Sequence, residues 1–385
     1  MVLVLLVLLA GAGTAGAGDL SGEVVVEGRL FPQDGADPAQ HGANVSLAFE
    51  PEFFHDWQDG QQRLVVLPFV RWDQGDGRRS HFDLRELFWR KSFSSADLYL
   101  GVRKVFWGVT ESLHLVDVIN QTDQVENGDG EDKLGQPMVQ LTWLRDWGTL
   151  DFFLLPYFRQ PTFAGRKGRL RGPLVDDDGV FEAGAEEWNP DLALRWSHYF
   201  GDIDLGLGHF YGTSRQPRFV PGPQKVVPHY DLLHQTSVDL QYTRGDWLGK
   251  LEAVYRDGID GRSVAAVGGF EYTRVGVLGT AADLGWVAEY QYDDRGAPFF
   301  PVGDNDLALG ARLTLNDVQD TDVLAFVAAD TDNGSLFGSL EGNRRVGASG
   351  EIRLEARLFT NVDAADPLAA LRRDDYVQFE FIRYF

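Results

Sequence analysis

The chain has 385 residues, among them 44 Gly, 26 Phe, 12 Tyr and 10 Trp but no Cys. The lack of cysteine excludes disulfide frameworks, Cys-ligated zinc, iron–sulfur clusters and cysteine nucleophiles. A formal charge of −23, from 35 basic and 58 acidic residues, excludes a nucleic-acid partner, which needs a basic face. Length alone predicts two or three domains, but the glycine and aromatic content favours one large all-β domain.

The N-terminus has the pattern of a secretory signal. Residues 2–10 are nine consecutive apolar residues, and the small-residue stretch 11–18 that follows contains Ala15-Gly16-Ala17. Nine residues are too few for a membrane-spanning helix, which needs about 20. We therefore expect a signal peptide at 1–17 and a single β-barrel domain at 18–385. The missing Lys or Arg before the run departs from the signal pattern, and a buried N-terminal helix is the alternative.

From residue 21 onward, segments of about ten residues alternate apolar and polar side chains. In residues 96–103, for example, Leu98 and Leu100 lie on one parity and Asp97 and Arg103 on the other. This period of two is typical of strands with two different faces. Eighteen such segments are expected, near 21–30, 42–54, 62–72, 80–90, 96–107, 137–145, 149–159, 190–200, 202–212, 231–243, 246–256, 263–274, 277–292, 305–315, 321–329, 335–342, 346–358 and 375–385.

The joints between these segments fall into two classes. Those after even-numbered segments are short, as at Gly201, Gly245 and 342–344, whereas 108–136, 160–189 and 213–230 are long and polar. Transmembrane barrels have this asymmetry, and a soluble sandwich has no reason for it. We predict a transmembrane antiparallel β-barrel of 18 strands (range 16–18), with long extracellular loops, short periplasmic turns and both termini periplasmic. Aromatic residues expected in its interfacial belts are Trp72, Phe106, Trp143, Trp147, Trp196, Phe200, Tyr211, Tyr255 and Tyr292.

The last segment carries an assembly motif. Phe379, Phe381 and the terminal Phe385 share one parity. This strand resembles the C-terminal signal that the outer-membrane barrel assembly machinery reads, although Arg383 stands where that signal usually has an apolar residue. The resemblance implies that the assembly machinery is a partner and that the protein resides in the outer membrane of a Gram-negative bacterium.

A second resemblance covers about a tenth of the chain. Residues 84–88, followed by 98–108 ending in Trp107-Gly108, are similar to paired strands of porin-like and alginate-export-like outer-membrane proteins. In those families such a strand leads into a long loop. The resemblance implies a constricted monomeric barrel through which small or polyanionic solutes diffuse, and it names no substrate.

The polar parity of the strands carries many charges. In a water-filled lumen these groups stay hydrated and create a transverse field that sorts ions. The alternative is a plugged barrel whose lumen holds structural ion pairs, which need good pairing to offset several kcal/mol of desolvation each. The predicted pore-lining residues are Arg63, Arg71, Arg85, Asp97, Arg103, Asp151, Asp191, Arg195, Arg312, Arg353 and Glu355.

The long joint 108–136 is a candidate constriction. Residues 110–119 have the spacing of a short helix with Thr110 as N-cap, and Glu111, His114 and Asp117 are its candidate constriction residues. Joints of this length are usually functional or disordered. Folding into the barrel and packing as an external helix on the rim are both open.

Two charged loop segments have simple interpretations. Residues 123–134 depart from the calcium-loop pattern, because Val125 and Leu134 stand at ligand positions. We therefore expect a solvated acidic loop. Loose cation binding shared with lipopolysaccharide is the alternative. The basic residues of 166–171 are expected to be exposed and to balance 176–178, or else to contact lipid phosphates. Because few acidic residues fall on strands, the loops should make the mouth negative and weakly cation-selective.

No catalytic pattern is present in the sequence. None of the eight His is followed two residues later by Ser, and neither Gly-x-Ser-x-Gly nor His-Glu-x-x-His occurs. We therefore predict no catalytic residues, no metal and no cofactor. The expected function is a passive outer-membrane channel for small hydrophilic or charged solutes, surrounded by outer-membrane lipid and lipopolysaccharide. The alternatives are a plugged surface scaffold and, third, a barrel enzyme acting on lipids.

Overall fold

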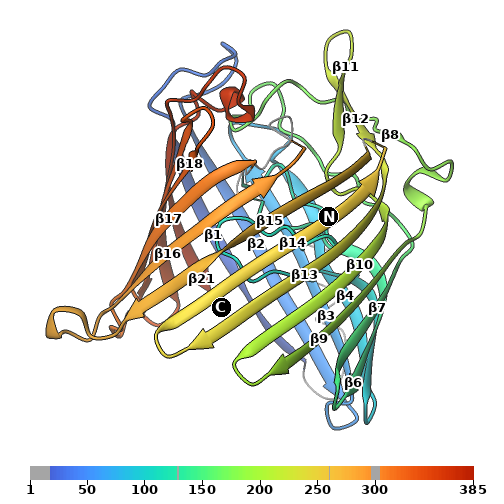
Figure 1. Cartoon of the computed structure of the whole chain (residues 1–385). Coiled ribbons are helices and arrows are strands. Elements are labelled where there is room, and N and C mark those ends of the chain that lie inside the picture. The colour runs from blue at the N-terminus through green and yellow to red at the C-terminus, as the bar shows by residue number, and fades with distance from the viewer. Residues whose placement is uncertain (1–17, 128–129, 260, 296–303) are drawn as a thin grey trace.

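The structure is a computed structural model that describes residues 18–127, 130–259, 261–295 and 304–385, so the expected signal peptide lies outside the described residues. Within them, 18 strands form one antiparallel sheet that closes where β1 pairs with β21 (Figure 1). The wall strands are β1 (Asp19–Leu30), β2 (Ala43–Trp57), β3 (Gln62–Asp73), β4 (His81–Ser92), β5 (Ala96–Arg103), β6 (Gln136–Arg145), β7 (Gly148–Leu155), β9 (Asp191–Phe200), β10 (Ile203–Thr213), β13 (Leu232–Arg244), β14 (Trp247–Gly258), β15 (Gly261–Arg274), β16 (Asp283–Asp293), β17 (Asn305–Thr314), β18 (Asp322–Asp330), β19 (Leu336–Val346), β20 (Gly350–Thr360) and β21 (Tyr376–Tyr384). The predicted all-β barrel is confirmed.

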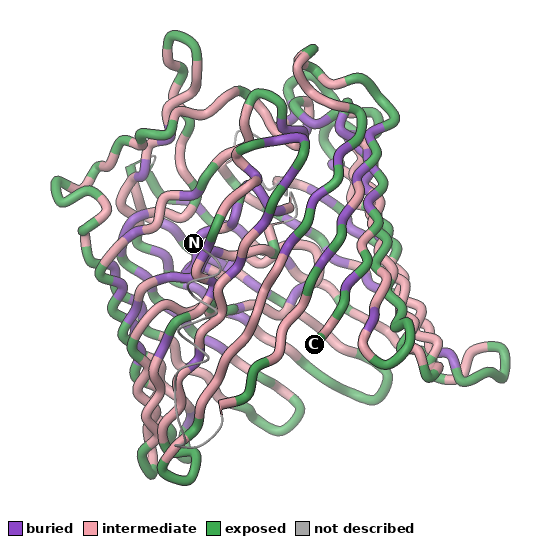
Figure 2. Tube along the Cα trace, turned by 180° about the vertical axis from the view of Figure 1, so that it is seen from behind, coloured by how far each residue is buried: buried purple, intermediate pink, exposed green. Residues whose placement is uncertain are grey.

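The two faces of the wall differ as the alternation predicts. In β21, Val377 and Phe379 are exposed on the outside, while Tyr376 and Gln378 are buried on the inside. Figure 2 shows buried and exposed positions following one another along the strands. The exposed positions are mostly Leu, Val, Phe, Trp and Tyr, which is the outer surface that a barrel presents to lipid. No helix among the described residues is long and apolar enough to cross a membrane.

The rims of the barrel are unequal, as expected. The tight turns lie at one rim, together with the start of β1 and the end of β21, while the long loops rise from the other (Figure 1). The turn expected at 342–344 is wrong: these residues lie inside β19, whose pairing with β20 continues to Val346. The turn follows at Gly347, whose φ of 66° is in the left-handed region that glycine adopts without strain.

A second, small sheet stands above the long-loop rim. β8 (Val180–Phe181), β11 (Arg218–Pro221) and β12 (Val226–Tyr230) form it, and three short 3₁₀ helices, η1 (Glu186–Trp188), η2 (Val277–Gly279) and η3 (Pro367–Ala370), lie in connections. The sequence did not predict this sheet, because strands of two to five residues give no measurable alternation.

The segment between β5 and β6, residues 104–135, folds into the barrel; we call it the inner loop. Its described residues form no helix, so the helix expected at 110–119 is wrong. Its amide groups donate to side chains of the wall instead of to carbonyls one turn earlier. β5 ends at Arg103, four residues before the expected end, so Phe106 belongs to the inner loop and not to an interfacial belt.

Candidate functional site

Two buried carboxylates of the wall hold the inner loop in place through hydrogen bonds. Glu252 of β14 is fully buried and accepts hydrogen bonds from the amides of Val109 (2.7 Å), Thr110 (3.1 Å) and Val116 (3.1 Å) and from the Thr110 hydroxyl (2.8 Å). These bonds satisfy loop amides that would otherwise be buried without partners, which is costly. Glu252 therefore fixes the path of the loop across the lumen.

Glu289 of β16 holds the next two residues in the same way. It accepts from the amides of Glu111 and Ser112, both at 2.8 Å, and from the Ser112 hydroxyl at 2.5 Å. The Glu111 side chain continues to β17 and β14, where it contacts Arg312 at 2.5 Å and Lys250 at 3.6 Å. The predicted constriction residue Glu111 thus bridges three strands of the wall.

The other two constriction candidates also lie inside the barrel. His114 contacts Glu131 at 3.1 Å and lies 3.9 Å from Glu252, while Asp117 pairs with Lys133 at 3.1 Å. Burial opposes a charge on His114, but the carboxylates of Glu131 and Glu252 outweigh it and raise the pKa of His114 to about 10. The imidazole is therefore a cation at neutral pH, and it links Glu131 of the same loop to Glu252 of the wall.

One side of the lumen is filled by apolar side chains, and we call it the apolar side. Trp107, Val116 and Ile119 of the inner loop are at most 5% exposed, and Gly208 leaves the space that the Trp107 ring occupies. The buried cluster comprises Trp107, Leu115, Val116, Val118, Ile119, Met138, Phe153, Leu155, Ala193, Phe210, Val254, Ala265 and Val267, from the inner loop and strands β6, β7, β9, β10, β14 and β15. Packing of this kind excludes water from that side of the barrel.

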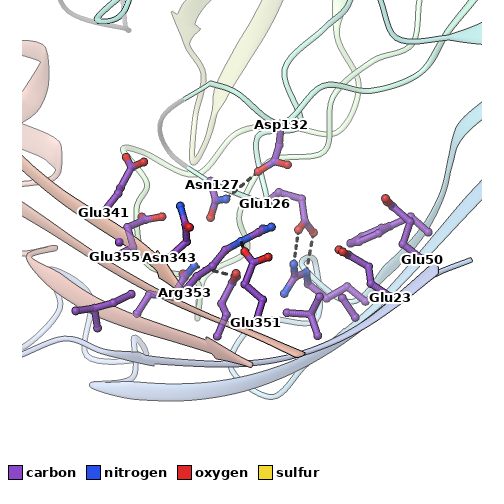
Figure 3. A pocket seen from close by; sticks show the side chains of 18 of the residues that line it. Glu23, Glu50, Glu126, Asn127, Asp132, Glu341, Asn343, Glu351, Arg353 and Glu355 are labelled. Carbon is purple, nitrogen blue, oxygen red and sulfur yellow. Dashed lines mark hydrogen bonds and ion pairs between the residues drawn. The ribbon is translucent and has the colours of Figure 1, made fainter. Parts of the chain in front are cut away.

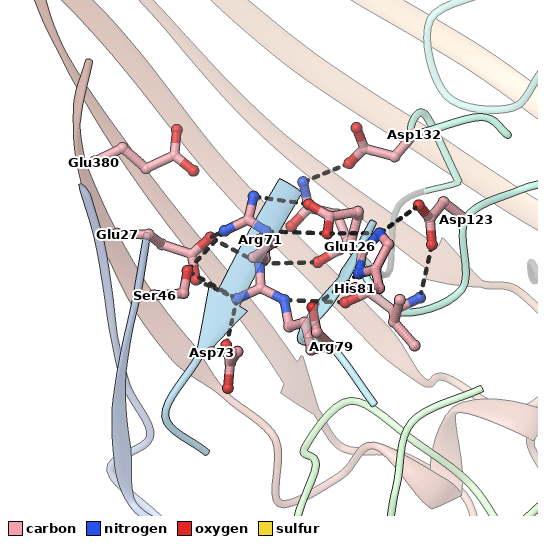
Figure 4. Close-up of polar contacts among 12 residues, drawn as sticks. Glu27, Ser46, Arg71, Asp73, Arg79, His81, Asp123, Glu126, Asp132 and Glu380 are labelled. Carbon is pink, nitrogen blue, oxygen red and sulfur yellow. Dashed lines mark hydrogen bonds and ion pairs between the residues drawn. The ribbon is translucent and has the colours of Figure 1, made fainter. Parts of the chain in front are cut away.

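The part of the inner loop that leads to β6 contacts strands β1 to β4 through a network of ion pairs (Figure 4). Glu126 pairs with Arg71 at 2.7 Å, and Arg71 also reaches Glu27 at 2.9 Å. Arg79 binds Glu27 at 2.6 Å and Asp73 at 2.8 Å. All five side chains are at most 7% exposed. Each charge has a close partner of opposite sign, which such burial requires.

This network corrects two sequence expectations. Glu126 and Asp123 are buried inside the barrel and paired with Arg71 and Arg85, so the described part of 123–134 is not a solvated loop at the mouth. The basic segment 166–171 is not uniformly exposed either: Arg169 is buried, pairs with Asp374 at 2.6 Å and donates to main-chain carbonyls. Both misjudgements have one cause, since the partners lie more than 35 residues away in sequence.

His81, Asp123 and Glu126 bring three ligand atoms within 4.8 Å of one another, the spacing of a metal site. The carboxylates are already used, however. Asp123 accepts from Arg85 at 2.9 Å, and Glu126 accepts from Arg71 at 3.0 Å. Two guanidinium cations in contact with the carboxylates disfavour a metal cation there, so we assign this group to the ion network.

The opposite side of the lumen, which we call the polar side, contains a cavity of about 610 Å³ (Figure 3). The wall around it belongs to β1–β4 and β19–β21, and the inner loop contributes Lys104, Glu126, Asn127 and Asp132. Nine carboxylates and five basic groups line the cavity, a formal balance of −4. Glu23 and Glu50 stand directly opposite each other on β1 and β2 and face the cavity.

The predicted pore-lining residues divide between the two sides. Arg71, Arg85, Arg353 and Glu355 line the cavity. The other seven also lie on the inward parity of their strands. Several of them form ion pairs outside the cavity, as Arg195 does with Asp239 at 2.7 Å. These other positions are Arg63, Asp97, Arg103, Asp151, Asp191, Arg195 and Arg312.

Four residues of the site were not singled out from the sequence. Glu27 and Arg29 alternate with apolar residues of β1, so strict use of parity would have identified them as inward-facing. Arg79 lies in a connection, where parity gives no information. No sequence signal marks Glu252 as an anchor for amides 136 to 143 residues earlier.

Comparison with known proteins extends only to the fold. No protein-family model matches the chain, and no curated protein does. A BenF-like porin from Pseudomonas fluorescens Pf-5 has a TM-score of 0.56 at 10% identity, covering 96% of this chain and 97% of that one. Wzi, described as a carbohydrate-binding barrel involved in group 1 capsule assembly in Escherichia coli, has a TM-score of 0.53 at 11% identity, covering 93% and 83%. A mutant Rhodopseudomonas blastica porin covers 96% of this chain and all of its own, with a TM-score of 0.47 at 10% identity. The chain thus has the porin-like fold, a closed antiparallel transmembrane β-barrel.

Proposed function

We propose that the protein is a passive channel of the Gram-negative outer membrane for small hydrophilic solutes, with a preference for cations at low salt. The observation that carries this proposal is the asymmetric lumen: the inner loop packs tightly on the apolar side but borders an ion-lined cavity on the polar side. A barrel with an apolar exterior and a charged interior passage suits diffusion of hydrated solutes across lipid.

The sign of the selectivity follows from the charges around the cavity. Nine carboxylates against five basic groups make its potential negative and concentrate cations. Salt screens this potential over a Debye length of about 10 Å at 0.1 M, so the preference fades toward 1 M. Reversal potentials in planar bilayers under a salt gradient test this. A cation preference that falls with salt supports the proposal, and an anion preference at low salt contradicts it.

A plugged barrel that serves as a surface scaffold is the second candidate. The buried ion network around Glu27 and the apolar packing around Val116 favour it, because both hold the inner loop rigidly inside the lumen. Single-channel recording separates the two candidates. Discrete conductance steps from the purified chain support the channel, and their absence from verified inserted protein supports the scaffold.

Orientation and assembly belong to the same proposal. The rim with loops 160–189 and 213–230 faces outward, and the terminal strand is read by the barrel assembly machinery. Phe385 exchanges main-chain hydrogen bonds with Gly22 of β1 at 3.1 and 3.2 Å, which places it at the closing seam. Deleting Phe385 should strongly lower the level of heat-modifiable barrel in the outer membrane. Unchanged levels of the barrel would contradict this assignment. The orientation is tested separately, by labelling intact cells at the exposed Arg166.

A further inference from the structure

Many buried carboxylates of the barrel pair with an arginine, and the buried Glu252 and Glu289 accept from inner-loop amides, but one group at the long-loop rim gathers several carboxylates without a cationic partner among the described residues. Seven carboxylates illustrate the pairing, each with an arginine no further away than 3.4 Å: Glu27, Asp73, Asp83, Asp123, Asp191, Asp239 and Asp374. The exceptional group lies where β17 and β18 meet the connections 331–335 and 361–375. It comprises Asp304, Asp306, Asp330, Asp332, Asp363 and Asp366, and none of these six forms an ion pair within the part of the chain that the structure describes.

Asp306 and Asp330 form the centre of this group. They stand directly opposite each other in the β17–β18 register, and each is only 5% exposed. Like charges at such positions repel, and burial strengthens the repulsion because the dielectric constant is low. The Asp306 Oδ2 atom is buried without any hydrogen-bond partner among the described residues, and so is the Asp304 Oδ1 atom. These two acceptor atoms therefore have no hydrogen-bond donor among the described residues.

The surrounding contacts hold the carboxylates in place without neutralising them. Asp330 accepts from the amides of Asp332 (2.7 Å) and Asn333 (3.1 Å). The Asn333 side chain donates both to Asp330 at 2.5 Å and to Asp366 at 3.1 Å, which joins the two connections. Asp366 is 4% exposed and accepts from the amide of Leu368 at 2.7 Å. The geometry is thus fixed by neutral donors, while the negative charge remains.

We propose that this rim group binds a calcium ion, with Asp306 and Asp330 as direct ligands and Asp304 as a ligand through water. Every available donor is oxygen, which suits a hard cation and disfavours zinc or copper. The three carboxylates do not converge within 4.8 Å as a set, so water and main-chain carbonyls must complete the shell of six to eight oxygens. Calcium tolerates such an irregular shell, whereas magnesium requires near-ideal octahedral geometry. Bound calcium would tie β17, β18 and the two connections together.

The test uses the full chain refolded in detergent without lipopolysaccharide, which binds divalent cations itself. Thermal unfolding is followed in EDTA and then in CaCl₂, MgCl₂ and NaCl at matched ionic strength. We expect calcium to raise Tm by several degrees with a midpoint between about 0.1 and 1 mM, and magnesium to act more weakly. Asp306→Asn should abolish the calcium response and unfold at a higher temperature than the wild type in EDTA, because the repulsion from Asp330 is removed.

Glu23→Gln is the matched control, since it also removes one of two opposed carboxylates, but beside the cavity. It should retain the full calcium response. A wild-type response to calcium no larger than to NaCl overturns the proposal and leaves protonation of Asp306 as the way the charge is removed. A full calcium response in Asp306→Asn, or an equal response to magnesium in the wild type, also contradicts the assignment. None of these results depends on conductance, so the calcium proposal and the channel proposal can fail independently of each other.

Discussion

The two sides of the lumen are built from opposite kinds of side chain, although the inner loop contributes to both. On the apolar side, Trp107, Val116 and Ile119 are buried against aliphatic and aromatic residues of the wall. On the polar side, the same loop borders a cavity through Lys104 and Asp132. The contrast indicates how one segment can close part of a barrel and leave the rest open: apolar packing removes water, whereas hydrated charges retain it.

The strongest test of this contrast introduces the same charge on each side. Val116→Asp places a carboxylate in a fully buried apolar position, close to the anchoring carboxylate of Glu252. An unpaired buried charge costs several kcal/mol, so we expect a large fall in Tm or failure to assemble. Asn343→Asp adds the same charge beside the cavity and should change stability by no more than about 0.5 kcal/mol. Equal thermal effects would show that the two sides do not differ in hydration.

Removing the anchors should release the loop without disturbing the polar side. Glu252→Ala together with Glu289→Ala leaves the amides of residues 109–112 and 116 without acceptors, at about 1–3 kcal/mol for each unsatisfied buried group. We expect a noisier, several-fold larger single-channel conductance. Lys250→Ala in the same region removes a contact with Glu111 but no amide acceptor and serves as control. Unchanged conductance in the double variant would mean that the apolar packing alone holds the loop.

The effect of pH on the loop follows from His114. Its pKa in the folded protein is about 10, well above the unfolded value near 6.5, because of Glu131 and Glu252. The stabilisation is therefore complete below pH 6.5 and is lost as the pH rises through about 10. The contribution of His114 to the conductance should be constant from pH 5 to 8, and the conductance should become larger and noisier above pH 10. His114→Gln should remove this alkaline change, and its persistence in the variant would contradict the role assigned to His114.

The smallest effect is expected from the hydrated carboxylates of the cavity. Glu23→Gln or Glu50→Gln removes one of nine negative groups, so the reversal potential at low salt should shift modestly toward zero. Asp257→Asn, at an exposed position outside the cavity, is the control. A shift in the control as large as in the cavity variants would assign selectivity to the total charge of the protein and not to the cavity.

The wall was predictable from the sequence because it depends on a local signal. Each of the 18 wall strands overlaps an expected segment, since alternation such as that of Val377, Phe379 and Phe381 directly reflects a lipid-facing surface. The inner loop was recognised as a candidate constriction, but its conformation was not predicted. The helical spacing of Leu115, Val118 and Ile119 arises from packing on several wall strands, and the amides bond to Glu252 and Glu289.

The charged partners of the site could not be predicted for a related reason. Glu126 and Arg71 are 55 residues apart, and Arg85 and Asp123 are 38 apart. A single sequence indicates which residues face inward but not which of them meet across the lumen. Where the distance along the chain is short, as for the alternating Glu27 and Arg29, the signal was available in the parity of β1.

The chain has no cysteine, so a single introduced thiol can test the central claim directly. Asn343→Cys lies beside the cavity, and Ala265→Cys lies in the apolar cluster with no exposed surface. Both are treated in planar bilayers with a charged methanethiosulfonate reagent while current is recorded. We predict that Asn343→Cys reacts rapidly and loses conductance, whereas Ala265→Cys neither reacts nor changes its current. Rapid reaction and block at Ala265→Cys, with none at Asn343→Cys, would place the solute path on the apolar side and contradict the account.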